Sequence, residues 1–117
     1  MMKLEDGVAG SAVVVCVGGR VDAANAPLLE AHGRRQLEEH GRKSLVLDLS
    51  TVEYLSSAGL RAILVLGKHT QALGGKLALC GVTGTVRQLF EMAGLLDLFP
   101  VADSLEKAVG LVMGGPR

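Results

Sequence analysis

The 117-residue chain has no tryptophan, one tyrosine and two phenylalanines, so aromatic side chains make up only 3% of it. Stacking platforms for nucleic-acid bases or sugar rings are therefore nearly absent. Twelve basic residues are balanced by twelve acidic ones. This zero net charge argues against nucleic acid as a partner, because binding to phosphates requires a basic excess on the protein.

Long apolar segments are also missing. No run of 18 apolar residues occurs, and residues 1–10 lack the apolar stretch of a signal peptide. The two cysteines, Cys16 and Cys80, lie in separate apolar runs. This placement favours buried thiols in a reducing compartment over a disulfide framework. We therefore expect a cytoplasmic protein that does not insert directly into a membrane.

Familiar catalytic and metal-binding motifs do not occur either. The sequence has no P-loop, G-x-G-x-x-G, HExxH or Cys-x-x-Cys motif, and no G-x-S-x-G elbow. His32, His40 and His69 are widely spaced on predicted helices, where we expect surface positions and not a shared metal. A hydrolase with Ser57 as nucleophile would need a positioned base and acid, which the sequence does not reveal. We therefore expect no catalytic residue, no metal or cofactor, and no enzymatic activity.

The residues that are present alternate between two apolar periodicities. Short Val- and Leu-rich runs bounded by glycine or polar residues predict strands, and apolar residues spaced three and four apart predict helices. The predicted strands are 2–6, 12–17, 44–49, 76–80 and 98–101. The predicted helices begin near Asn25, Ser57, Thr83 and either Asp103 or Ser104; Gly41 ends the first and Gly94 the third.

This alternation predicts the fold class. Helices inserted between successive strands imply right-handed crossovers and an α/β fold. We expect a mixed, mainly parallel sheet of about five strands with four helices. A chain of this length and apolar content suits a single domain spanning residues 1–117.

A polar segment after the third predicted strand is the best candidate for a site. The strand ends near Asp48, a short loop follows, and a helix begins near Ser57, at the edge where open α/β sheets place their sites. Ser57 falls at or near the N-cap, with Ser56 just before it. Serine is a good helix cap, so a purely structural role explains the pair equally well. Alternatively, backbone N–H groups and the helix dipole would stabilise a phosphate there, and its charge would switch partner binding without unfolding the domain.

Five segments carry a family resemblance. They read GRVDAANAP at 19–27, LVLDLS at 45–50, YLSSAGLR at 54–61, GGKL at 74–77 and VRQLFEMAGL at 86–95. In this order, over nearly the whole chain, they resemble the STAS domain family. The resemblance is strongest to the free-standing anti-sigma-factor antagonists of bacteria.

The resemblance implies a partner-switching regulator. In that family the unphosphorylated antagonist binds an anti-sigma factor that is also a serine kinase with a histidine-kinase-type ATPase fold, and this frees the sigma factor. Phosphorylation of one serine reverses the binding, and a PP2C-type phosphatase restores the active form. The acceptor serine lies two residues before Gly59, which makes it Ser57, with Ser56 as second choice. Ser56 replaces the aspartate of sporulation-type members, and Ala58 replaces their serine.

The resemblance also implies a partner-binding face made of Asp22, Asn25, Ser56, Ser57 and Arg61. Asp22 matches a loop aspartate that lies near the acceptor in the family. It would orient the hydroxyl, repel a phosphate, or only cap a turn, as aspartate commonly does. The same resemblance extends to a different class of protein, a STAS scaffold subunit of a membrane lipid-transport ATPase complex that is never phosphorylated.

Overall fold

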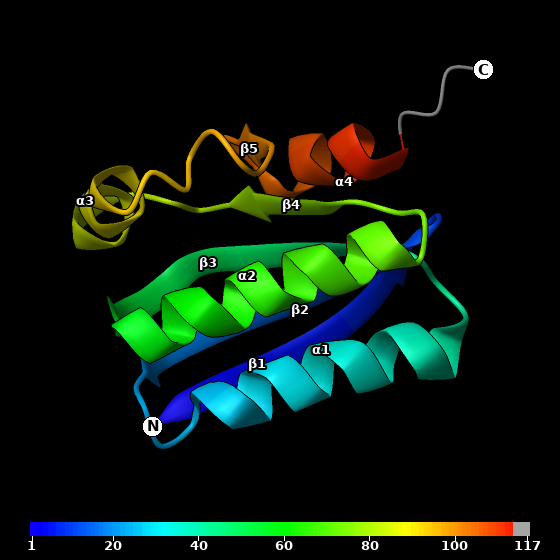
Figure 1. The fold of residues 1–117 in the computed structure, drawn as a ribbon. Coiled ribbons are helices and arrows are strands. Elements are labelled where there is room, and N and C mark those ends of the chain that lie inside the picture. Colours follow the sequence, from blue (N-terminus) through cyan, green and yellow to red (C-terminus); the bar gives the residue numbers. More distant parts are fainter. Residues whose placement is uncertain (114–117) are drawn as a thin grey trace.

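A mixed five-stranded sheet with the order β1-β2-β3-β4-β5 forms the centre of the computed structural model, which describes residues 1–113 (Figure 1). β1 runs antiparallel to β2, and the other neighbours are parallel. The predicted fold class, with four helices, is confirmed. The elements are β1 (Met2–Ala9), β2 (Ala12–Val21), α1 (Ala26–His40), β3 (Ser44–Leu55), α2 (Ser57–Ala72), β4 (Leu77–Cys80), α3 (Gly84–Met92), β5 (Val101–Ala102) and α4 (Leu105–Met113).

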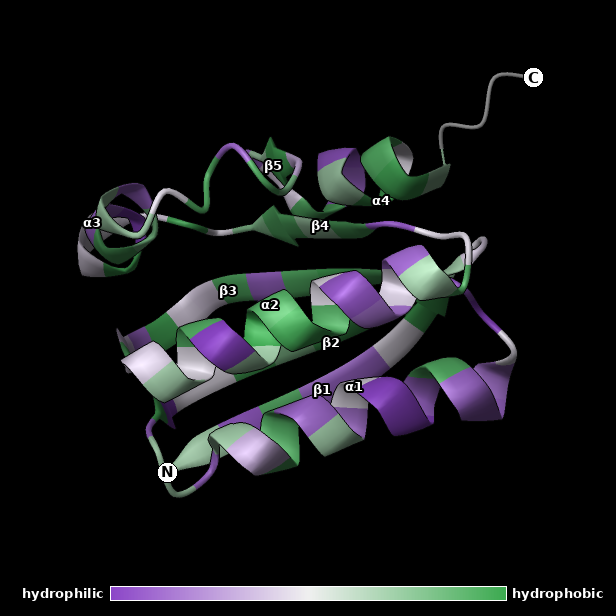
Figure 2. Ribbon diagram, in the orientation of Figure 1, coloured by the Kyte–Doolittle hydropathy of each residue, from purple (hydrophilic) through white to green (hydrophobic). Residues whose placement is uncertain are grey.

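The two faces of the sheet are covered unequally. In β2, Val13 and Val15 belong to the main core with α1, α2 and α3, whereas Val14 belongs to a smaller core with α4. Both sides of these strands are therefore apolar, as expected for parallel strands. Figure 2 shows apolar stretches along β3 and β4 and polar residues along the C-terminal half of α1. The helices divide three to one between the faces of the sheet.

Two central strands are longer than predicted. β2 continues through Gly18 and Gly19 to Val21, and β3 continues to Leu55, so the loop expected after Asp48 is wrong. The two strands stay paired through register shifts at the glycines. Gly19 adopts a φ of +80°, which few other residues tolerate. Pairing with a neighbouring strand has overridden the polar composition of residues 50–54.

The edge strands also differ from their predicted bounds. β1 pairs with β2 over eight residues, Met2–Ala9, which confirms the predicted hairpin and lengthens it. β5 is Val101–Ala102 and not 98–101. Pro100 precedes the strand and contributes only its carbonyl oxygen, which accepts a hydrogen bond from the Leu79 N–H at 2.9 Å.

The surface positions expected for the histidines hold only for His40. Nε2 of His32 lies 2.6 Å from Oδ1 of Asp6, so this half-buried ring bridges α1 and β1. His69 is also half-buried on α2. The expectation was wrong for these two because helical spacing does not show which side of a helix meets a neighbouring strand.

Candidate partner-binding site

The start of α2 is fixed by Ser56. Its backbone is extended (ψ 171°), and its hydroxyl accepts a hydrogen bond from the Gly59 N–H at 3.1 Å. Ser56 is therefore the N-cap residue, one position before the N-cap expected from the sequence, and it is half-buried.

Ser57 is the first residue of the helix and is exposed. Within residues 1–113, its hydroxyl has no hydrogen-bond partner. The first turn of α2 contains no acidic residue, so no side chain there offsets the positive end of the helix dipole. Arg61 is exposed one turn further along, on the same side of the helix as Ser57. A phosphate on Ser57 would thus meet backbone N–H groups that lack intrahelical acceptors and would have a guanidinium within reach.

Gly59 allows α2 to begin close against the strand ends. A Cβ at this position would lie 2.6 Å from Cδ1 of Leu55 and 2.9 Å from Cγ1 of Val21. The Ser56 N–H donates to the carbonyl oxygen of Val21 at 2.9 Å, which joins the end of β2 to the start of α2. The serine pair is therefore held against the carboxyl ends of two parallel strands.

Asp22 and Asn25 build the turn between β2 and α1. Oδ1 of Asp22 accepts from the N–H groups of Ala24 and Asn25, both at 3.0 Å. Oδ1 of Asn25 accepts from the Asp22 N–H at 2.9 Å, and its Nδ2 donates to the carbonyl oxygen of Arg20 at 3.0 Å. The turn-capping role of Asp22 is observed directly. Because Val21 bonds to Ser56, this turn lies beside the serine pair.

The sequence reasoning missed three side chains at this end of the molecule. The Arg20 guanidinium lies over the Tyr54 ring, 4.4 Å from its centroid, and Tyr54 is 41% exposed. Leu28, in the first turn of α1, is 63% exposed. The sequence did contain a signal for Leu28. It is a large apolar residue outside the helical spacing of Ala26 and Leu29, which predicts that it is exposed. We call Asp22, Asn25, Leu28, Tyr54, Ser56, Ser57 and Arg61 the Ser57 face.

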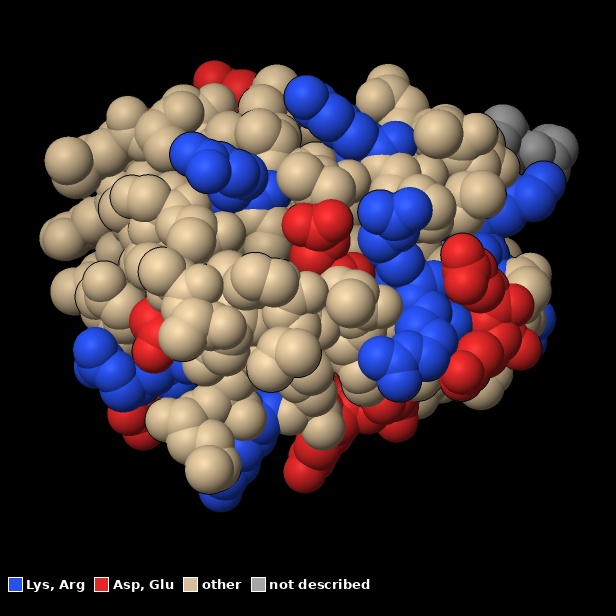
Figure 3. All heavy atoms as spheres, turned by 60° about the horizontal axis from the view of Figure 1, so that its bottom comes forward, with Lys and Arg blue, Asp and Glu red and all other residues tan. Residues whose placement is uncertain are grey.

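The distribution of charge sets this end of the molecule apart. In Figure 3, Lys, Arg, Asp and Glu side chains gather over the C-terminal half of α1, at the right. The exposed Arg and Glu residues of that half are Arg34, Arg35, Glu38 and Glu39. The opposite end, where α2 begins, carries mostly uncharged side chains in this view. Because few charges would have to be desolvated, removing this surface from water on binding a partner costs little free energy.

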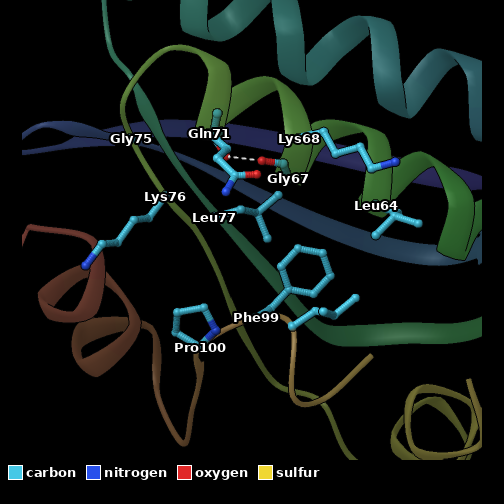
Figure 4. A pocket seen from close by; sticks show the side chains of 11 residues that line it. Leu64, Gly67, Lys68, Gln71, Gly75, Lys76, Leu77, Phe99 and Pro100 are labelled. Atoms are coloured by element: carbon cyan, nitrogen blue, oxygen red, sulfur yellow. Dashed lines mark hydrogen bonds between the residues drawn. The ribbon is translucent and has the colours of Figure 1, made fainter. Parts of the chain in front are cut away.

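A separate groove lies away from the Ser57 face. A groove of about 410 Å³ lies between the second half of α2 and the segment before β5. Figure 4 shows the Phe99 ring inside it, with the side chains of Lys68 and Lys76 extending in opposite directions. None of the predicted site residues lines this groove, so it is not the predicted site.

The two cysteines form a row with Asp48 across three strands. In the sheet register Cys16 lies opposite Asp48, and Asp48 lies opposite Cys80. Sγ of Cys16 is 4.0 Å from Oδ2 of Asp48. Burial, and then the Asp48 carboxylate, raises the pKa of the Cys16 thiol and raises the pKa of Cys80 to about 12. Both cysteines are free and remain protonated near neutral pH, which makes them poor nucleophiles.

Residues 1–113 contain neither a candidate metal cluster nor a candidate membrane-spanning helix. No cluster of three or more His, Cys, Asp or Glu side chains is arranged to hold a metal ion. None of the helices described combines the length and apolar character needed to cross a membrane.

Comparison with known proteins gives a consistent result. The sequence model of the STAS domain matches residues 3–108. BtrV of Bordetella bronchiseptica, named as a candidate anti-sigma factor antagonist, is 41% identical over 107 residues, which cover 92% of this chain and 91% of that protein. The anti-sigma-B factor antagonist of Staphylococcus aureus is 30% identical over 92 residues, 79% of this chain and 84% of that one. The crystal structure of an anti-sigma factor antagonist from Mycobacterium paratuberculosis superposes with a TM-score of 0.81 at 26% identity, covering 97% and 95% of the two chains.

Proposed function

Because this chain belongs to the STAS domain family, we propose that it is an anti-sigma factor antagonist whose binding to its partner is switched by phosphorylation of Ser57. The observation that carries the proposal is the exposed position of Ser57 at the start of α2, where no group of residues 1–113 forms a hydrogen bond with its hydroxyl. The names of the relatives support the same function.

The choice of Ser57 over Ser56 rests on access. A kinase must reach a hydroxyl oxygen in line with the transferred phosphoryl group. Ser57 is exposed, whereas Ser56 is half-buried and its hydroxyl accepts a hydrogen bond from the Gly59 N–H. Phosphorylation of Ser56 would give up this cap, so Ser57 is the acceptor that leaves the helix intact.

The switch follows from the change in charge. A phosphate adds about −1.5 to −2 charges at neutral pH. The N–H groups at the start of α2 and the Arg61 guanidinium stabilise that charge in the free protein. A partner docked on the Ser57 face would have to desolvate the phosphate, and any acidic group opposite it would be repelled. Phosphorylation therefore weakens binding while the fold persists.

The proposed partners follow from this chemistry and from the family. An anti-sigma factor with a histidine-kinase-type ATPase fold would bind the Ser57 face and phosphorylate Ser57, and a PP2C-type phosphatase would remove the phosphate. This chain would act in the cytoplasm through binding alone, without chemistry of its own. The exposed apolar area of Leu28 and Tyr54 on the Ser57 face suits a protein surface.

The experiment that tests the proposal is intact-mass spectrometry with site mapping. The protein is incubated with ATP and the ATPase encoded nearest to it in its genome. One added phosphate on Ser57 is expected, with none on the Ser57→Ala variant. Binding of Ser57→Ala should match the wild type, and Ser57→Asp should bind at least about tenfold more weakly, which corresponds to about 1.4 kcal/mol.

The competing outcomes are distinct. Phosphate on Ser56 would move the acceptor by one residue and contradict the access argument. A stable complex with no phosphate on any residue would refute the switch, and would instead support the unphosphorylated scaffold subunit of a lipid-transport ATPase. A Ser104→Ala variant, which changes a serine at the distant start of α4, serves as the control for both readouts.

A further inference from the structure

β1 forms one open edge of the sheet. β1 is the first strand of the sheet (Figure 1), it is eight residues long, and five of those residues are exposed. Among residues 1–113, no strand pairs with that edge. The opposite edge is β5, which is only two residues long. A long edge strand presents a row of unpaired N–H and C=O groups that can pair with another chain.

We propose that β1 is a self-association surface, on which β1 of a second copy of this chain pairs antiparallel to join the two sheets. In the proposed register, the residue numbers of two opposite residues, one from each copy, add up to eight. We use this sum below to name each possible register. Lys3 of each copy then lies opposite Glu5 of the other, and Leu4 lies opposite Leu4 of the second copy. This interaction is separate from the proposed anti-sigma factor antagonism.

The geometry of the backbone restricts the possible registers. Alternate residues of an edge strand direct their N–H and C=O groups outward, and the residues between them direct these groups to the neighbouring strand. In two copies of the same strand, the outward N–H and C=O groups belong to the same residues, which are either all odd-numbered or all even-numbered. Opposite residues in an antiparallel pair of such strands must therefore both be odd or both be even. Only even sums of the paired residue numbers allow continuous hydrogen bonding.

Charge selects one register from these. A sum of six places Lys3 opposite Lys3, a sum of ten places Glu5 opposite Glu5, and a sum of twelve places Asp6 opposite Asp6. Each of these brings like charges directly together across the strands, which is destabilising. A sum of eight replaces these contacts with two Lys3–Glu5 pairs and pairs five residues of β1 in each copy, Met2–Asp6. The sums of four and fourteen avoid like charges but place no acidic residue of β1 opposite a basic one, so they gain no ion pair.

The side chains in question are free to make these contacts. Lys3 and Glu5 are exposed, line an open hollow on the α4 side of the sheet, and have no ion-pair partner within residues 1–113. Asp6 points to the other side, where it meets His32 of α1. In the order of the sheet β2 separates β1 from β3, the strand that leads into α2. The Ser57 faces of both copies would remain available in the dimer.

The test is a charge exchange read by sedimentation velocity. From micromolar to millimolar concentration, the weight-average mass of the wild type should rise towards twice the monomer mass. Lys3→Glu and Glu5→Lys should each shift the midpoint at least about tenfold to higher concentration. The double variant Lys3→Glu/Glu5→Lys should restore the wild-type curve, because it exchanges the two charges. Lys107→Glu, on the exposed side of α4, is the control and should not change association.

A second measurement covers the case of weak association. Opposite residues in an antiparallel pair have Cα atoms roughly 4.5–5.5 Å apart, within the range of a disulfide. Under mild oxidation, Leu4→Cys should form a covalent dimer several-fold faster than Val8→Cys, which has no opposite residue in this register. A wild type that stays monomeric with equal cross-linking of the two variants overturns the proposal. Failure of the double variant to restore association overturns the register. Neither result alters the phosphorylation of Ser57, so the two proposals fail independently.

Discussion

The two serines at the start of α2 should differ sharply when each is replaced by alanine. Ser56 is the N-cap, and its hydroxyl accepts the Gly59 N–H at 3.1 Å. Losing this bond leaves a helix N–H without its partner and costs about 1 kcal/mol, within a range of roughly 0.5–2 kcal/mol. For a domain of this size, we expect the melting temperature of Ser56→Ala to fall by about 3–5 °C.

Ser57→Ala should have the opposite effect on stability. The Ser57 side chain is exposed and lies within the helix. Alanine has a higher helix propensity, so the replacement should leave the free energy of unfolding unchanged or raise it by up to about 0.5 kcal/mol. The two variants should therefore differ by about 1 kcal/mol or more, although their positions are adjacent.

Urea denaturation measures this difference, provided that the slope of the unfolding free energy with urea stays constant. Ser104→Ala is the matched control, because the Ser104 hydroxyl accepts the Lys107 N–H at 3.2 Å at the start of α4. It should lose about as much stability as Ser56→Ala, and it should keep full phosphorylation. If Ser57→Ala loses as much stability as Ser56→Ala, the assignment of cap and acceptor is wrong.

Two further predictions concern a glycine and a thiol. Gly59→Ala should lower the free energy of unfolding by about 1–3 kcal/mol, because its Cβ would overlap Leu55 and Val21. Gly110→Ala, in an open helical position, should instead raise it by about 0.5–1 kcal/mol; equal effects in urea denaturation would contradict the close packing at Gly59. Burial raises the pKa of Cys80 to about 12 from 9.0, so the folded state keeps this proton where the unfolded chain releases it. The free energy of unfolding should therefore fall as the pH rises above about 9, by up to about 1.4 kcal/mol per pH unit from this thiol. Urea denaturation of Cys80→Ala should show a shallower decline, and identical slopes for the two proteins would disprove the shift.

Local sequence signals were enough to identify the order of strands and helices. The spacing of apolar residues and the end signals at Asn25 and Gly41 act within a few residues, and the structure contains them where expected. The serine pair was also visible, because a hydroxyl before an apolar helix is a local feature. Which serine caps the helix depends on the backbone angles of Ser56. The spacing of apolar residues does not fix the start of a helix to within one residue.

Strand ends and surface neighbours depended on contacts distant in sequence. β3 extends to Leu55 because β2 pairs with it past Gly18, and no property of residues 50–54 alone indicates this. The Arg20–Tyr54 contact requires that same pairing. The link from Val21 to Ser56 spans 35 positions along the chain and joins the turn of Asp22 to the serine pair. Residue patterns thus identified the elements and the serine pair. Only the packing of β2 against β3 and α2 could bring them together, because those contacts form between segments that do not adjoin in sequence.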